Sequence, residues 1–122
     1  MAKVIGLGGI FFKSRDPAAL AAWYAKHLGL DAEEWGGARF VENEQRPGYT
    51  LWSPFAADTG YFGPGAQSYM INFRVDDLDA LLAQLRSAGV EVDERVDQSE
   101  FGRFGWITDP EGTRIELWQP PE

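Results

Sequence analysis

The chain consists of two similar halves that begin and end with matching apolar segments. Residues 10–16 align with residues 71–77 through an apolar pair, a cation and a final aspartate. Each half later contains the pattern Leu-Trp-x-Pro, at residues 51–54 and at residues 117–120. A repeat of this kind indicates that both halves adopt the same arrangement of strands and helices.

A helical pattern follows the opening segment in each half. The pair Asp16-Pro17 is typical of a helix start, and this helix is expected to end before Gly29. In the second half the leucines of residues 78–85 form one stripe at helical spacing. Asp76 or Asp77 is the expected N-cap there, and Gly89 the expected end.

Short strands are expected between each helix and the closing Leu-Trp segment. Each half is therefore predicted as a β-α-β-β-β module, with module 1 at about residues 1–57, a Gly-rich linker at about 58–65, and module 2 at about 66–122. The additional strands are expected at residues 30–34, 37–42, 90–96 and 104–108.

Alternation along the strands divides their side chains between two faces. The helices require an apolar sheet face beneath them, for which the pattern supplies Ile10, Phe12, Leu51, Ile71, Phe73, Ile115 and Leu117. The opposite face combines large aromatic rings with isolated polar groups, which is typical of a cavity wall. This second set consists of Gly9, Phe11, Lys13, Thr50, Trp52, Met70, Asn72, Arg74, Arg114, Glu116 and Trp118.

Composition narrows the possible functions. The 122 residues are 44% hydrophobic and 25% charged, as in an ordinary single domain, and the net charge of −8 disfavours nucleic acid and anionic membranes as partners. The absence of cysteine excludes thiolate chemistry, and a single histidine excludes a multi-histidine metal site within the chain. Without an apolar run long enough for a membrane span, we expect a cytoplasmic protein.

Three segments carry a resemblance to a known family: Asp16-Pro17 ahead of Leu28-Gly29-Leu30, then residues 73–79, then residues 109–117. In this order, and within a duplication, the sequence resembles the vicinal oxygen chelate superfamily, the group of glyoxalases, bleomycin- and fosfomycin-resistance proteins and extradiol dioxygenases. The resemblance implies an α+β fold in which two β-α-β-β-β modules curl eight strands into one open cup. It also implies that the functional site lies inside the cup.

Many members of this superfamily hold a divalent metal on the first and last strand of each module. The resemblance assigns those positions here to Gly9, Thr50, Met70 and Glu116. Only Glu116 could bind such an ion strongly, because glycine offers no side-chain ligand and a thioether suits these ions poorly. We therefore expect no bound metal and no other cofactor.

Two main functional hypotheses remain, and the aromatic content bears on both. The chain contains five Trp, four Tyr and eight Phe, so the protein could bind a small aromatic or apolar molecule. The residues expected to contact this molecule are Phe11, Thr50, Trp52, Met70, Asn72, Trp106 and Trp118. Alternatively, the protein could be a glyoxalase-like lyase or isomerase in which Glu116 acts as general base and Asn72 or Arg74 supports the enolate.

Other interpretations of the same residues stay open. Trp52 and Trp118 occupy equivalent positions, where their rings either line a cavity or fill it. The aromatic residues could also form a dimer interface of an interaction or sensor domain, and a homodimer is the expected assembly. His27, near the end of the first helix, is expected to stabilise that helix end rather than to take part in catalysis.

Overall fold

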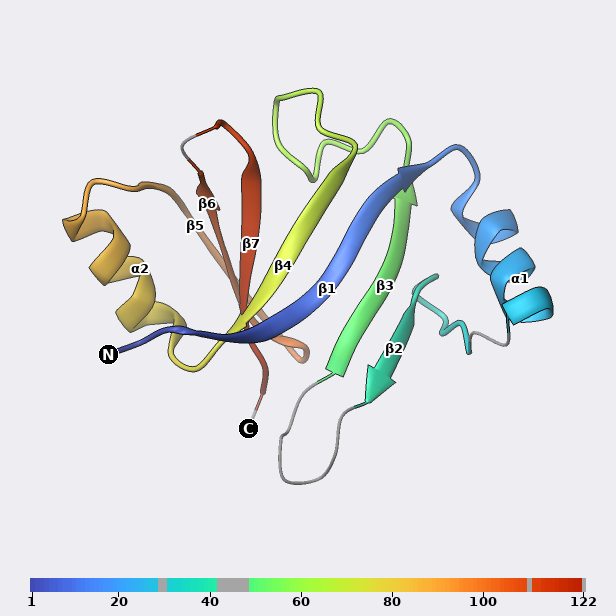
Figure 1. Ribbon diagram of the computed structural model, residues 1–122, viewed down its shortest axis with the longest axis horizontal. Coiled ribbons are helices and arrows are strands. Elements are labelled where there is room, and N and C mark those ends of the chain that lie inside the picture. Colours follow the sequence, from blue (N-terminus) through green and yellow to red (C-terminus); the bar gives the residue numbers. More distant parts are fainter. Residues whose placement is uncertain (29–30, 42–48, 110, 122) are drawn as a thin grey trace. The chain divides into compact units, whose positions relative to one another are not determined.

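The computed structural model describes residues 1–28, 31–41, 49–109 and 111–121 (Figure 1). The chain divides into two compact units. Unit 1 consists of Met1–Gly8 and Ile71–Glu122, and unit 2 consists of Gly9–Met70. The first eight residues therefore pack with the second half of the sequence.

The protein is an α+β structure with two helices and a seven-stranded mixed sheet. The hydrogen-bonded strand order is β2-β3-β1-β4-β7-β6-β5. The helices are α1 (Pro17–Leu28) and α2 (Leu78–Ser87), and the strands are β1 (Val4–Ser14), β2 (Ala38–Val41), β3 (Tyr49–Ala56), β4 (Tyr69–Val75), β5 (Glu91–Ser99), β6 (Gly102–Thr108) and β7 (Arg114–Gln119). Neither helix in the described part of the chain is long and apolar enough to cross a membrane.

One predicted strand is wrong, and its loss accounts for seven strands in place of eight among the described residues. Of residues 30–34, those from 31 onward form no strand and lead into a turn, whereas residues 29–30 lie outside the described part. The Glu33 N–H donates to the Gly37 carbonyl at 2.8 Å, and the Gly36 N–H donates to the Glu33 carbonyl at 2.9 Å. Gly36 adopts a φ of 100°, a conformation that glycine readily supplies.

Unit 1 is built around α2, whose leucines pack on the sheet as the sequence predicted. Asp77 is the N-cap: its side chain accepts a hydrogen bond from the Ala80 backbone N–H at 3.1 Å. The helix ends where Gly89, at a φ of 82°, donates to the Arg86 carbonyl. Leu78, Leu81 and Leu82 are buried with Val75 and Leu117, and partly buried apolar side chains surround them, namely Ala2, Phe73, Leu85, Val92, Ile107 and Ile115.

Unit 2 contains α1 and the strands β2, β3 and most of β1. Asp16 is confirmed at the start of α1, where its carboxylate accepts from the Ala19 N–H at 3.1 Å. The helix contacts β3. Phe11 of β1, Phe55 of β3 and Phe62 pack together, with ring centroids 5.2 Å apart for Phe11 and Phe55 and 5.1 Å apart for Phe55 and Phe62. Part of the predicted linker thus contributes to the core of this unit.

The strand register in unit 2 corrects the predicted face of Trp52. In unit 1, Ile71 lies opposite Ile115, so an equivalent pairing would place Ile10 opposite Tyr49. Instead Ile10 lies opposite Trp52, a shift of three residues. An odd shift exchanges the two faces of a strand.

Thr50 and Trp52 therefore share the side of Ile10, and the Trp52 ring lies 5.5 Å from Phe12. Leu51 lies opposite Gly9, on the side predicted for the cavity. The expectation that Ile10 packs beneath a helix is also wrong, since this side chain is 51% exposed.

Candidate functional site

Glu116 is the centre of a buried polar cluster in unit 1, together with Asn72 and Trp106. Asn72 on β4 and Trp106 on β6 both lie opposite Glu116 on β7, so the three side chains share one face. Asn72 Nδ2 donates to Glu116 Oε1 at 2.6 Å, and Trp106 Nε1 donates to Glu116 Oε2 at 2.9 Å. Glu116 is only 1% exposed. We refer to these three residues as the Glu116 cluster.

Two arginines lie close to the indole of this cluster. The Cζ atoms of Arg95 and Arg114 are 5.2 Å and 5.4 Å from the Trp106 ring centre, within the range of cation–π attraction. Asp97 accepts two hydrogen bonds from Arg95, at 2.8 Å and 2.7 Å, and Asp93 pairs with Arg114 at 3.1 Å. These carboxylates position the guanidinium groups beside Trp106.

The pKa of Asp93 reflects these contacts. It lies below its usual value, chiefly because the Arg95 backbone N–H donates to the carboxylate at 2.9 Å. Partial burial works in the opposite direction, and the Arg114 guanidinium lowers the pKa further. Asp93 is therefore charged at neutral pH and holds Arg114 in place.

Gly8 and Trp118 enclose the other side of Asn72. A Cβ atom at Gly8 would collide with Asn72 Oδ1 and would come within 3.1 Å of Trp118 Cε3. Asn72 Oδ1 is buried and accepts no hydrogen bond. Trp118 donates from Nε1 to the Phe101 carbonyl at 2.7 Å and stacks on Phe104 with an interplanar angle of 10°. The site thus depends on a residue without a side chain.

This arrangement limits what Glu116 can do chemically. A general base needs a lone pair within reach of the substrate proton, yet Glu116 is only 1% exposed and each of its oxygens already accepts one hydrogen bond from a neutral N–H donor. The other superfamily ligand positions do not fit a divalent metal, because Gly9 has no side-chain ligand and the thioether of Met70 suits these ions poorly. Among the described residues, no group of three His, Asp or Glu side chains is placed to hold an ion.

The predicted binding residues fall into two sets. Unit 1 brings Asn72, Trp106 and Trp118 together around Glu116. In unit 2, Phe11 belongs to the phenylalanine cluster, whereas Trp52 packs against Phe12. Five of the predicted residues are almost fully buried in the structure, so that they offer little surface to a ligand: Phe11, Met70, Asn72, Trp106 and Trp118. Thr50 and Trp52 are half-buried.

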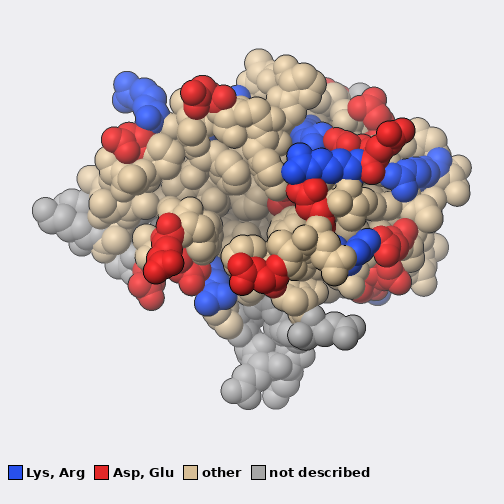
Figure 2. Space-filling model, turned by 180° about the vertical axis from the view of Figure 1, so that it is seen from behind, with Lys and Arg blue, Asp and Glu red and all other residues tan. Residues whose placement is uncertain are grey.

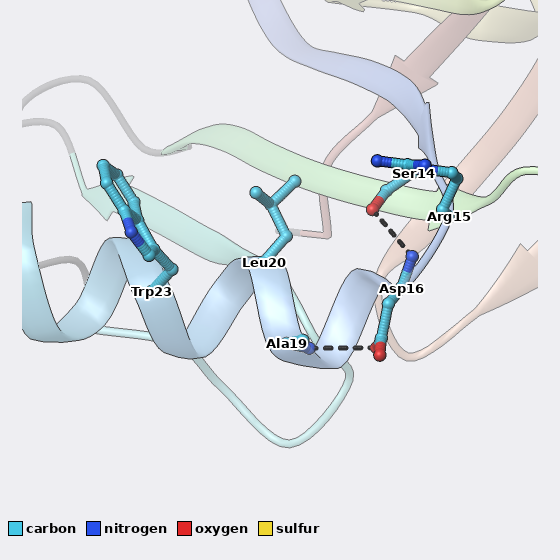
Figure 3. A pocket seen from close by; sticks show the side chains of 6 residues that line it. All are labelled: Ser14, Arg15, Asp16, Ala19, Leu20 and Trp23. Carbon is cyan, nitrogen blue, oxygen red and sulfur yellow. Dashed lines mark hydrogen bonds between the residues drawn. The ribbon is translucent and has the colours of Figure 1, made fainter.

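A hollow at the junction of β1 and α1 was missed by the sequence analysis. It measures about 720 Å³, lies within unit 2 and opens to solvent. Figure 3 shows its lining, which consists of Ser14, Arg15, Asp16, Ala19, Leu20 and Trp23. Trp23 stands at helical spacing from Leu20 and is 52% exposed. The sequence offered only Arg15 at the start of the helix and Trp23 about two turns further along it, and the exposure of the indole cannot be read from a sequence. The His27 side chain lies outside the described residues.

Charged side chains of both signs are interspersed on the surface. On the face in Figure 2, Lys and Arg stand singly or in small groups beside Asp and Glu. Arg103, for example, pairs with Asp79 at 2.6 Å, and Arg39 pairs with Glu33 at 3.1 Å. This pattern is typical of a solvated surface rather than of a face that binds phosphate groups.

Comparison with known proteins establishes the family. Residues 9–118 match the family model of the glyoxalase-like domain, and the chain therefore belongs to this family. Together with the structural neighbours, the match places the protein in the vicinal oxygen chelate superfamily, as the sequence predicted. No curated protein sequence matches the chain.

Several solved structures share the fold. Methylmalonyl-CoA epimerase from Mycobacterium tuberculosis is 23% identical, with a TM-score of 0.66 over 98% of this chain and 90% of that chain. A variant of the Streptomyces coelicolor epimerase, bound to 2-nitronate-propionyl-CoA, is 18% identical, with a TM-score of 0.75 over 98% and 100%. A Legionella pneumophila structure described as an NAD-dependent benzaldehyde dehydrogenase is 19% identical, with a TM-score of 0.61 over 93% and 98%. At these identities the likeness concerns the fold alone, which is compatible with many reactions.

Proposed function

We propose that this glyoxalase-like protein binds a small aromatic or apolar molecule, and that it does so without the divalent metal used by many members of its superfamily. The observation that carries the proposal is the state of Glu116. It is the one carboxylate at a family ligand position, and both of its oxygens are engaged by Asn72 and Trp106. Glu116 is therefore part of the buried hydrogen-bond network of unit 1.

The aromatic residues support the class of ligand. Small-molecule sites are lined mainly by apolar and aromatic side chains, with a few polar groups that fix the orientation. The chain carries five tryptophans, and two of them, Trp23 and Trp35, are about half exposed. The hollow beside Trp23 has a volume within the range of about 300–1,000 Å³ that is typical of such sites.

The alternative function, a lyase or isomerase with Glu116 as general base, has less support. Proton abstraction next to a carbonyl would require Glu116 to release one hydrogen bond and to reach the substrate from a position that is 1% exposed. Asn72 is already bonded to Glu116 and is therefore not free to stabilise an enolate through the same N–H group.

The test is a binding screen of the full chain in the presence and absence of EDTA. A panel of planar aromatic and aliphatic compounds is titrated while tryptophan fluorescence and the melting temperature are followed. We expect at least one aromatic compound to quench the fluorescence and raise the melting temperature equally with and without EDTA. A panel without any binder would overturn the proposal, as would binding that requires added nickel, zinc, iron or manganese.

A second measurement separates binding from catalysis. Candidate carbonyl compounds are incubated with the protein in deuterium oxide, and loss of the proton next to the carbonyl is followed by NMR. We expect no exchange above the buffer rate. Exchange that the wild-type protein catalyses and the Glu116→Gln variant does not would establish the alternative function instead.

A further inference from the structure

The geometry points to the hollow at the junction of β1 and α1 as the binding site, and to a flat aromatic carboxylate as its ligand. This inference rests on the proposed function and gives it a location and a ligand class. The hollow lies within unit 2, whereas the sequence pattern assigned binding to a different set of residues. Of the six lining residues, none belongs to that predicted set.

Apolar side chains of α1 form one wall of this hollow. Ala19, Leu20 and Trp23 succeed one another along the helix, and Figure 3 shows Leu20 and Trp23 projecting to the same side. The exposure of Trp23, at 52%, leaves much of its indole in contact with water. Covering this ring with a planar aromatic ligand would remove apolar area from solvent and add stacking attraction.

The charged side chains at the junction of β1 and α1 favour an anionic group at that end of the hollow. Arg15 is exposed, and in Figure 3 its side chain extends from the corner toward Leu20. Asp16 points in another direction, toward Ala19, whose N–H it accepts at 3.1 Å. The Asp16 carbonyl accepts from the Leu20 N–H at 3.0 Å, and the Asp16 N–H donates to Ser14 Oγ at 3.2 Å. The cation available to a ligand is therefore Arg15, and not the helix terminus.

A guanidinium group matches a carboxylate because it can donate two parallel hydrogen bonds. The overall charge of −8 opposes anion binding in general, but charges farther away than about 8–10 Å are largely screened at physiological ionic strength. Arg15 thus determines the local preference. A ligand whose ring covers Trp23 while its carboxylate reaches Arg15 would satisfy both sides of the hollow.

The test compares 2-naphthoate with its uncharged analogue 2-naphthamide by isothermal titration calorimetry on the full chain. Trp23→Ala is expected to weaken both compounds by about tenfold or more, because each loses its stacking surface. Arg15→Gln is expected to weaken naphthoate about threefold and naphthamide hardly at all, as for an exposed ion pair. Raising the salt concentration should reproduce the Arg15→Gln pattern in the wild-type protein.

Matched controls come from the same unit. Trp35 is also exposed, and Arg39 is also a surface arginine, but neither lines the hollow. Trp35→Ala and Arg39→Gln should leave the binding of both compounds within twofold of wild type. Circular dichroism of every variant verifies that the fold is retained, so that a loss of affinity can be assigned to the site.

The outcomes distinguish this inference from the proposed function. If naphthoate binds and Trp23→Ala leaves its affinity unchanged, or if Trp52→Ala or Trp118→Phe abolishes binding instead, the location is wrong and the binding function stands. If other aromatic compounds bind but both naphthalene compounds do not, the ligand class is wrong. If no compound of the panel binds, both the inference and the proposed function fail.

Discussion

Replacement of Gly8 by alanine is the sharpest test of the Glu116 cluster, because the perturbation is a single methyl group. The backbone at Gly8 does not have a positive φ, so alanine can adopt it without strain. The added Cβ, however, would collide with Asn72 Oδ1. Asn72 must then move, and its 2.6 Å hydrogen bond to Glu116 is the contact that it loses.

The expected change in the free energy of unfolding combines two destabilising contributions and one stabilising contribution. Loss of a buried hydrogen bond to a charged group costs about 1.5–3 kcal/mol, and overpacking around Trp118 adds about 1 kcal/mol or more. Replacing glycine by alanine restricts the unfolded chain and returns about 0.4–1 kcal/mol. We therefore expect Gly8→Ala to lower the free energy of unfolding by about 2 kcal/mol.

Urea unfolding, followed both by tryptophan fluorescence and by far-ultraviolet circular dichroism, measures this change. A loss of about 2 kcal/mol corresponds to a midpoint lower by about 1 M for a typical slope. Gly65 provides the control, since nothing lies within 4 Å of its added Cβ and its φ is also not positive. Gly65→Ala is expected to be neutral or slightly stabilising.

A double mutant locates the cause of the loss. In the Asn72→Ala background the collision is absent, so Gly8→Ala should cost at least about 1 kcal/mol less there than in the wild type. If Gly8→Ala proves as stable as Gly65→Ala, or if the two substitutions are additive, the description of the packing between Gly8 and Asn72 is refuted.

Two further predictions concern the same unit. Glu116→Gln should lower the free energy of unfolding by about 1–3 kcal/mol, because the amide can accept only one of the two N–H groups and turns its own donor toward the other; a midpoint equal to or above wild type would contradict it. The pKa of Asp93 in the folded protein is below the ordinary pKa of an aspartate. Its ion pair therefore stabilises the fold fully when the pH is above the ordinary pKa, and this stabilisation is lost as the pH falls through the folded-state pKa. Asp93→Asn should therefore flatten the acid-side decline of stability below about pH 4, by less than about 1 kcal/mol since the carboxylate is partly exposed. Parallel pH curves for the variant and the wild type would rule this out.

Local signals in the sequence predicted the helices well. Asp16 and Asp77 each cap a helix through their own side chain, and Gly89 ends the second helix with a positive φ. These interactions involve residues only a few positions apart, so the sequence contains nearly all the information that they require. The face of α2 that packs on the sheet followed in the same way from the spacing of its leucines.

Pairing between distant segments was harder to predict. The repeat suggested that β3 aligns with β1 as β7 aligns with β4, but the two registers differ by three residues. Register depends on contacts along the whole strand, and an odd shift exchanges every side chain between the faces. The positions of Thr50, Leu51 and Trp52 were wrong for this reason.

The sequence predicted which residues form the Glu116 cluster, but not the hydrogen bonds between them. Alternation placed Asn72 and Glu116 on one face, and Trp106 was expected nearby. That both neighbours donate to the two oxygens of the same carboxylate depends on side-chain rotamers, which a pattern of apolar and polar positions does not encode. The roles expected for these residues in ligand binding stay predictions.

The allocation of Met1–Gly8 to unit 1 determines the order in which the protein can be completed during synthesis. A ribosome produces these residues first, whereas their partners from Ile71 onward emerge only later. Unit 2 is contiguous in the chain, so all of its residues are made before unit 1 is complete. The amino-terminal segment, with its apolar Val4, Ile5 and Leu7, therefore remains without its native partners until the second half of the chain has been made.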